Sequence, residues 1–157
     1  MLDDAAIQSK EDWLKWILDK RPSIQTQLNA WLRLVQTLEP GRQNNWSSHQ
    51  LNEEDAAVLM RNGTNDVSGR CLVIASVRLP PPFQRRGWFK AFLSECCREN
   101  PWPQLVIEDV ENPHLRGFLE RLNCRVLNSR YSTTYVVNQQ EVLALGTPSL
   151  QPLASYV

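Results

Sequence analysis

The sequence of 157 residues lacks a long hydrophobic run. A membrane-spanning helix needs about 20 consecutive apolar residues, and no apolar stretch approaches that length. The chain begins with Met-Leu-Asp-Asp, which is acidic where a secretory signal would be basic. We therefore expect a cytoplasmic protein without a membrane-spanning segment.

The sequence also lacks net charge, because 17 basic residues balance 17 acidic ones. Binding to nucleic acid or to an anionic membrane by long-range attraction is favoured by an excess of basic residues. A local basic patch could still form, with Trp88 and Phe89 available for base stacking. The zero balance and the spread of acids argue against that interpretation. The basic residues concerned are Arg78, Arg85, Arg86, Lys90 and Arg98.

Metal and disulfide patterns are missing from the four cysteines and two histidines. No Cys-x-x-Cys pair occurs, and His49 and His114 lie far along the chain from the adjacent Cys96 and Cys97. Three of the cysteines stand in apolar contexts, which indicates buried thiols in a reducing compartment. The sequence therefore predicts no metal site.

The composition, with 42% hydrophobic and 22% charged residues, is typical of one soluble globular domain. Residues 1–41 predict a helical hairpin, residues 53–137 a sheet with a cofactor-binding core, and residues 138–157 an extended C-terminal arm. The alternation of helix and strand patterns predicts an α/β fold, an α+β mixed sheet with at least one parallel crossover.

Two apolar stripes at helical spacing define the predicted hairpin, and Pro22 can start its second helix. We expect both stripes to pack on the rest of the domain. The alternative is that Trp13, Trp16 and Trp31 line a groove for a substrate or a protein partner.

The predicted strands begin after a polar loop at 42–52. Residues 53–61 fit a short helix or a strand, and the Asn62-Gly63 turn signal favours a strand at 56–61 paired with 71–79. Residues 63–69 have loop composition. The apolar run Leu105-Val106-Ile107 is typical of a central strand. Residues 125–137 are also strand-like, with a break near Asn128-Ser129.

Residues 71–99 organise the rest of the chain. An apolar strand pattern is followed by three prolines, then Gln84-Arg85-Arg86-Gly87, then an amphipathic helix from Trp88. The first N–H groups of a helix have no intrahelical partners, glycine lets the backbone approach a ligand, and arginine adds charge. This order predicts a phosphate-binding loop. The alternative is an ordinary strand–helix connection with two solvated arginines.

A second helix start follows the strand at 105–107. Asn112 can cap it, Pro113 suits its first position, and Asn123 can end it in a left-handed conformation. Glu108 and Asp109 stand at the strand's end, where only one is expected to face a cleft because neighbours on a strand point oppositely. They are either catalytic carboxylates or solvated acids.

Residues 71–137 resemble the acyl-CoA-binding half of the GNAT superfamily of N-acyltransferases. The family's loop pattern, Gln/Arg-x-x-Gly-x-Gly/Ala, is matched by residues 84–89 up to its last position. Its asparagine corresponds to Asn112, and its Tyr-x-x-x-Gly-Phe-like run corresponds to 118–124. The resemblance implies a single GNAT-like domain over 1–157 that uses acetyl-CoA or another acyl-CoA.

The resemblance also implies roles for individual residues. The backbone of Val77, Arg78 and Leu79 would pair with the pantetheine arm, and Asn112 would lie beside the thioester. An amine of a small molecule or protein would attack the acyl group, with Glu108 or Asp109 as the base and a backbone N–H of the splayed strand stabilising the oxyanion. The pyrophosphate would bind the loop residues Gln84, Arg85, Arg86, Gly87, Trp88 and Phe89.

Three positions depart from the family pattern. Phe89 replaces a small residue, Leu119 stands where many members have a tyrosine that protonates the thiolate, and Asn123-Cys124 replaces Gly-Phe. Tyr131 or Tyr135 could supply the missing hydroxyl, or both could pack between strands. These departures motivate an alternative function, a catalytically inactive GNAT-like module that binds a protein partner through its tryptophans.

Overall fold

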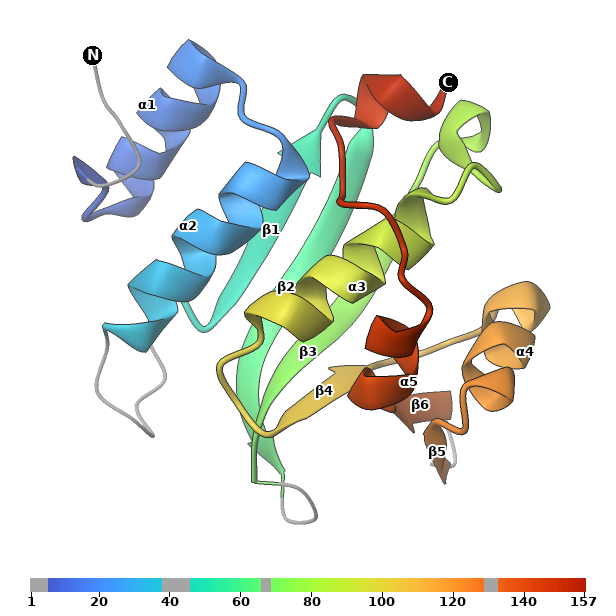
Figure 1. The fold of residues 1–157 in the computed structure, drawn as a ribbon. Coiled ribbons are helices and arrows are strands. Elements are labelled where there is room, and N and C mark those ends of the chain that lie inside the picture. Colours follow the sequence, from blue (N-terminus) through green and yellow to red (C-terminus); the bar gives the residue numbers. More distant parts are fainter. Residues whose placement is uncertain (1–5, 38–45, 66–68, 129–132) are drawn as a thin grey trace.

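The computed structural model describes residues 6–37, 46–65, 69–128 and 133–157 (Figure 1). Within these ranges the fold is mixed α/β, with five helices and a six-stranded mixed sheet. The helices are α1 (Lys10–Lys20), α2 (Ile24–Gln36), α3 (Trp88–Glu99), α4 (Pro113–Arg121) and α5 (Gln139–Ala144). The strands are β1 (Ser48–Glu53), β2 (Ala56–Asn65), β3 (Gly69–Arg78), β4 (Gln104–Ile107), β5 (Arg125–Asn128) and β6 (Thr133–Val136). Two short 3-10 turns are η2 (Pro81–Phe83) and η3 (Leu153–Tyr156).

The strand order in the sheet is β1-β2-β3-β4-β6-β5. Strands β3 and β4 are parallel and are joined through α3, and the other neighbouring pairs are antiparallel. The predicted mixed sheet with a parallel crossover is therefore confirmed. Figure 1 shows α2, α3 and α5 in front of the same face of the sheet.

The core lies between this sheet face and the helices. It includes Leu28 of α2, Phe92 of α3 and Leu119 of α4, all fully buried. A second, smaller cluster of buried residues contains only strand residues: Cys71, Val73, Val106 and Val136. The main core therefore fixes α3 against the sheet and also includes Leu119 of α4, which lies beside β5 and β6 in Figure 1.

The N-terminal helical hairpin forms as the sequence predicts, with one correction. Ser9 caps α1, where its hydroxyl accepts a hydrogen bond of 3.1 Å from the Asp12 N–H. Ser23 caps α2, so Pro22 precedes that helix and does not start it. The serine hydroxyl satisfies a free N–H group, which proline at the first helical position only avoids.

The tryptophans of the hairpin belong to the core. Trp13 and Trp16 are 3% exposed, and Trp31 is fully buried and donates from Nε1 to the Trp46 carbonyl at 2.7 Å. These indoles cannot form the exposed groove or partner surface that the alternative interpretation required. The expectation that the apolar stripes of the hairpin pack on the rest of the domain is therefore confirmed for these three tryptophans.

Strand β1 contradicts the loop predicted for 42–52. Its side chains alternate between exposed and buried, with His49 and Leu51 directed inward. The strand was not predicted because it is short and polar, and because one of its two buried residues is a histidine. Residues 42–45 of that predicted loop lie outside the described part of the chain.

The β2–β3 hairpin is confirmed and is longer than predicted, since residues 63–65 and 69 belong to its strands. The break in 125–137 is also confirmed, because this segment forms the antiparallel pair β5–β6. Tyr131 and its neighbours in 129–132 lie outside the described residues.

The predicted extended arm is wrong for residues 139–144, which form α5, whereas residues 146–152 have no helix or strand. Asn138 caps this helix by accepting a hydrogen bond from the Glu141 N–H at 3.3 Å. The apolar residues Val142, Leu143 and Leu145 were expected to anchor the arm, but only Val142 of the three is buried, and Leu143 and Leu145 are exposed. Gly146, Pro148 and Pro152 were the basis for predicting an extended segment, whereas the Asn138 cap and the burial of Val142 decide the local structure of 139–144.

Helix α4 begins and ends as predicted. The Asn112 side chain accepts hydrogen bonds from the N–H groups of His114 at 2.8 Å and Leu115 at 3.4 Å. Asn123 follows the helix with a φ of 57°. Local capping chemistry therefore fixes where α4 meets the end of β4.

Candidate functional site

Strands β3 and β4 diverge after four paired residues. Their register runs from Cys71 beside Gln104 to Ile74 beside Ile107, and the Glu108 N–H donates to the Ile74 carbonyl at 3.0 Å. Strand β3 then continues to Arg78, whereas β4 ends at Ile107. No β4 residue lies beside the last four residues of β3, and a cleft of about 430 Å³ opens there.

The cleft is lined by the end of β3, the first turn of α3, and the segment that joins β4 to α4. Five of the residues predicted for the site line it: Val77, Phe89, Glu108, Asp109 and Asn112. The other predicted residues of the described chain, Arg78, Leu79, Gln84, Arg85, Arg86, Gly87 and Trp88, connect Val77 to Phe89 at one end of the cleft. The remaining lining residues are Ile74, Ala75, Ser76, Ile107, Val110, Glu111 and Leu115.

A β-bulge lies in the wall of the cleft. Leu59 pairs with Ser76 and Met60 pairs with Ile74, so Ala75 has no partner in β2. The strand pairing with β4 also stops at Ile74. A bulge leaves its extra residue unpaired and is over-represented next to active sites. The backbone of Ala75 therefore faces the cleft region without a strand partner on either side.

The loop before α3 adopts two left-handed residues, Arg85 with a φ of 58° and Gly87 with a φ of 89°. The Gln84 side chain donates to the Leu79 carbonyl at 2.7 Å and folds the loop back on the strand. Gly87 precedes α3 and provides no side-chain cap, so no side chain caps the first-turn N–H groups. A Cβ atom at Gly87 would meet nothing within 4 Å, so glycine is required here by the backbone angle.

The two aromatic residues after the loop have different environments. The Trp88 side chain is buried and stacks on Phe92 with ring centroids 5.1 Å apart. Only the backbone of Trp88 can therefore contact a ligand. Its ring cannot stack on a base, which weakens the interpretation of this region as a nucleic-acid-binding site. Phe89 lies in the wall of the cleft and leaves the volume beside it open.

Cationic side chains surround the helix ends at the cleft. Arg85 and Arg86 are exposed, and Arg85 Nη2 lies 3.1 Å from His114 Nε2 of α4. The Lys90 ammonium lies 5.3 Å from the ring centre of Phe118. These groups add positive charge to the free N–H groups of α3, an arrangement that favours an anionic ligand.

Glu108 and Asp109 both line the cleft, although strand alternation predicted only one. The alternation does not extend to them because β4 ends at Ile107 and Asp109 has a left-handed φ of 53°. The Glu108 carboxylate forms an ion pair with Arg61 of β2. Among the described residues the exposed Asp109 side chain has no such partner, so of the two predicted carboxylates it is the unpaired one; Glu111, which also lines the cleft, is exposed too.

The wall that carries Asp109 is braced by α4 and β6. The Val110 N–H donates to the Thr133 carbonyl at 2.8 Å, and Arg116 Nε donates to the Val110 carbonyl at 2.6 Å. Arg116 Nη2 also donates to Thr133 Oγ1 at 3.3 Å.

Arg61, Ala75 and Arg116 were not predicted from the sequence, because their contacts depend on strand register that no local pattern reveals.

No tyrosine lines the described part of the cleft. Leu119 is fully buried in α4, and the hydroxyl of the buried Tyr135 donates to Glu120 Oε1 at 3.2 Å. Burial, and next the hydrogen bond with Glu120, raises the pKa of Tyr135. Tyr135 therefore packs against α4, and among the residues that line the cleft Ser76 is the one with a hydroxyl.

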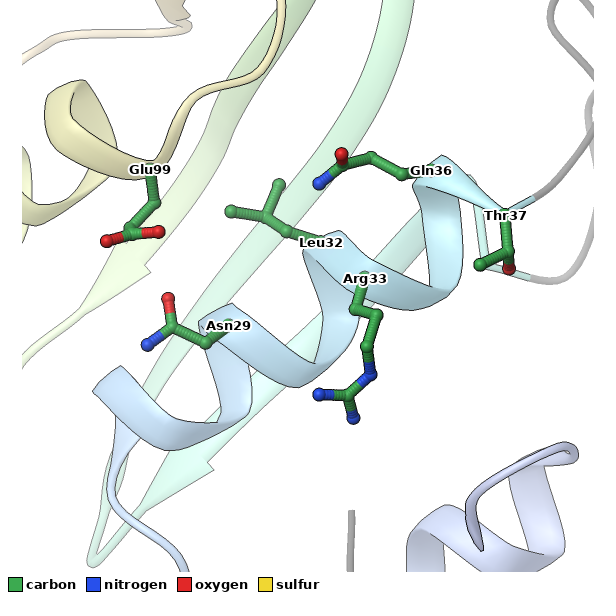
Figure 2. Close-up of a pocket in the computed structure, with 6 residues that line it drawn as sticks. All are labelled: Asn29, Leu32, Arg33, Gln36, Thr37 and Glu99. Atoms are coloured by element: carbon green, nitrogen blue, oxygen red, sulfur yellow. The ribbon is translucent and has the colours of Figure 1, made fainter. Parts of the chain in front are cut away.

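A second hollow, of about 290 Å³, lies between α2 and the C-terminal end of α3 (Figure 2). Asn29, Leu32 and Gln36 extend from α2 toward Glu99, whereas Arg33 points away from it. This hollow lies at the opposite end of α3 from Gly87 and contains none of the predicted site residues.

A scan against protein-family models and a search of curated proteins give no match for this chain. The described ranges contain no group of three or more side chains that could hold a metal ion, and none of their helices is long and apolar enough to cross a membrane. The cleft between β3 and β4 is the candidate functional site.

Proposed function

We propose that this protein is a GNAT-like N-acyltransferase that moves an acetyl group from acetyl-CoA, or another acyl group from its thioester, to an amine. The observation that carries the proposal is the divergence of the parallel strands β3 and β4 beside the glycine loop of α3. This arrangement brings the end of β3, the uncapped N–H groups of α3 and the Asp109 carboxylate around one cleft.

Each part of an acyl-CoA has a complementary part of the cleft. The amides of the pantetheine arm can pair with the backbone of Ala75 to Arg78, which has no β4 neighbour. The pyrophosphate suits the first-turn N–H groups of α3 and the nearby Arg85 and Arg86. Phe89 and Leu115 provide apolar contact along the walls.

The reaction needs a base and a group that stabilises the oxyanion. In the proposed step the amine nitrogen bonds to the acyl carbon, the Asp109 carboxylate takes the amine proton, and the carbon–sulfur bond breaks to release the thiolate. We assign oxyanion stabilisation to the backbone N–H of Ala75, the bulge residue that has no partner residue in β2 or β4. The tyrosine that would protonate the thiolate is missing at Leu119, so the thiolate leaves without that acid or takes a proton from water.

Acetyl-CoA is expected to raise the melting temperature, because a ligand that binds only the folded state stabilises it. At about 100 times the dissociation constant the gain is about 2.7 kcal/mol, or roughly 5–10 °C for a chain of this size. Gly87→Val should abolish the increase, since valine is strained at a φ of 89° and would displace the first-turn N–H groups. The measurement is differential scanning fluorimetry with and without acetyl-CoA.

Gly146→Val is the matched control, because Gly146 also has a left-handed φ, of 63°, with open space around its Cβ, and lies after α5. Each variant is compared with its own ligand-free melting temperature, so that backbone strain cancels. The proposal fails if millimolar acetyl-CoA leaves the wild-type melting temperature unchanged.

A second function is favoured by the burial of Leu119 and the missing tyrosine hydroxyl. In this version the chain binds the acyl-CoA without transferring the acyl group and serves as a module for a protein partner. A thermal shift without thiol release in the presence of primary amines would distinguish it from the enzyme.

A further inference from the structure

His49 lies at a junction between α1 and the sheet that the proposed function does not use. It sits on the inner face of β1, opposite Met60 of β2, and is 8% exposed. Its ring packs edge-on against Trp13 of α1 with centroids 4.4 Å apart and is tilted against Trp46 at 5.2 Å. The imidazole is therefore enclosed by aromatic side chains from α1 and from the approach to β1.

Lys10, the first residue of α1, closes this cluster. Its ammonium lies 2.5 Å from His49 Nδ1 and 4.3 Å from the centre of the Trp46 ring. An ammonium has only hydrogens to donate, so Nδ1 must be the acceptor and His49 must be neutral, with its proton on Nε2. Nε2 is buried and has no hydrogen-bond partner among the described residues.

We propose that this Lys10–His49 contact is an acid-sensitive latch, in which neutral His49 holds α1 against the sheet and its protonation releases α1. A protonated imidazole can no longer accept the lysine hydrogen bond, and it places a second positive charge beside the ammonium in a site with little water. Among the residues that the structure describes, Lys10 is the charged group that faces the ring, whereas Trp13, Trp46 and Met60 are uncharged.

The attachment of α1 is limited enough for such a release. Trp13 and Trp16 are the buried residues of α1, whereas Leu14 and Leu18 on its other side are 62% and 78% exposed. Helices α2 and α3 in contrast bury several residues each in the core. Local release of α1 with the remaining fold intact is therefore physically reasonable.

The direction of the pH effect follows from linkage. Burial, and next the Lys10 ammonium, lowers the pKa of His49 to about 3, compared with about 6.5 for a free imidazole. The released state thus binds the proton more tightly, and attachment weakens as the pH falls from 6.5 toward 3. The equilibrium for release should increase about 25-fold between pH 7 and pH 5, and about 200-fold between pH 7 and pH 4.

The test is hydrogen–deuterium exchange of the full-length chain between pH 7 and pH 4, followed by mass spectrometry of peptides from α1, α2 and α3. Wild-type α1 should lose protection on acidification while α2 and α3 keep theirs. His49→Gln, whose amide oxygen accepts from Lys10 and does not titrate, should keep α1 protected. Comparison of variants at the same pH cancels the intrinsic pH dependence of exchange.

The chain offers a matched control, because His114 is its other histidine and is exposed on α4. His114→Gln should leave the response of α1 as in the wild type. If His49→Gln does not fold, Lys10→Gln serves instead: it removes the like charge, so the acid response of α1 should become shallower. The proposal is overturned if α1 stays protected to pH 4, if it opens only together with α2 and α3, or if neither His49→Gln nor Lys10→Gln alters its response.

Discussion

Replacing Asp109 by asparagine should lower the rate of acyl transfer by about 100-fold and leave the binding of coenzyme A unchanged. The effect is that expected for loss of a general base, because the amide cannot take the proton of the attacking amine. Asparagine is nearly isosteric and also tolerates a left-handed backbone, so the φ of 53° at this position should be kept. The measurement is thiol release from acetyl-CoA with a panel of a polyamine, an arylalkylamine and a lysine peptide.

Glu108→Gln is the control for this prediction. Its carboxylate is engaged by Arg61, so its loss should affect stability more than the rate of transfer. Equal rate losses in the two variants would contradict the assignment of Asp109 as the base. An active Asp109→Asn protein would show that another group, or an ordered water, takes the proton.

Glu53→Gln should lower the free energy of unfolding by about 2 kcal/mol and the melting temperature by roughly 4–8 °C. Glu53 Oε1 accepts from the Ile24 N–H at the start of α2 at 3.0 Å, and Oε2 accepts from the Leu153 N–H at 2.7 Å. One carboxylate at the end of β1 therefore connects the N-terminal hairpin with the C-terminal segment. Glutamine keeps one acceptor oxygen and turns an NH₂ group toward the other N–H, which leaves that donor unsatisfied.

Glu54→Gln is the matched control, since Glu54 is the next residue, is exposed, and has no hydrogen bond or ion pair within the described ranges. Its effect on unfolding in urea should stay within about 0.5 kcal/mol. A Glu53 variant as stable as the Glu54 variant would mean that the two backbone N–H groups find other partners.

Local chemistry could be predicted from the sequence where the deciding atoms are neighbours in the chain. The cap Asn112, the left-handed Asn123 and the helix that follows Gly87 depend on contacts within a few residues. The family resemblance implied a splayed strand beside the cofactor, and five residues predicted from that resemblance line the cleft between β3 and β4. These features needed no knowledge of strand register.

Features set by long-range register could not be predicted. Strand β1 is polar because one of its two inward residues is His49, whose burial depends on Trp13 and Lys10 from α1. The ion pair of Arg61 with Glu108 and the bulge at Ala75 both depend on how β2 is aligned with β3. The burial of the three hairpin tryptophans likewise follows from the core, since the same helical stripe could have faced a partner.

The central claim is that an acyl-CoA binds between β3 and β4. A crystal structure of the protein soaked with coenzyme A tests it most directly. We expect the pyrophosphate at the backbone N–H groups of residues 87–89 and the pantetheine arm along Ala75 to Arg78, with the thiol pointing toward Asp109. Coenzyme A bound elsewhere, or a cleft that stays empty at millimolar coenzyme A, would contradict the account.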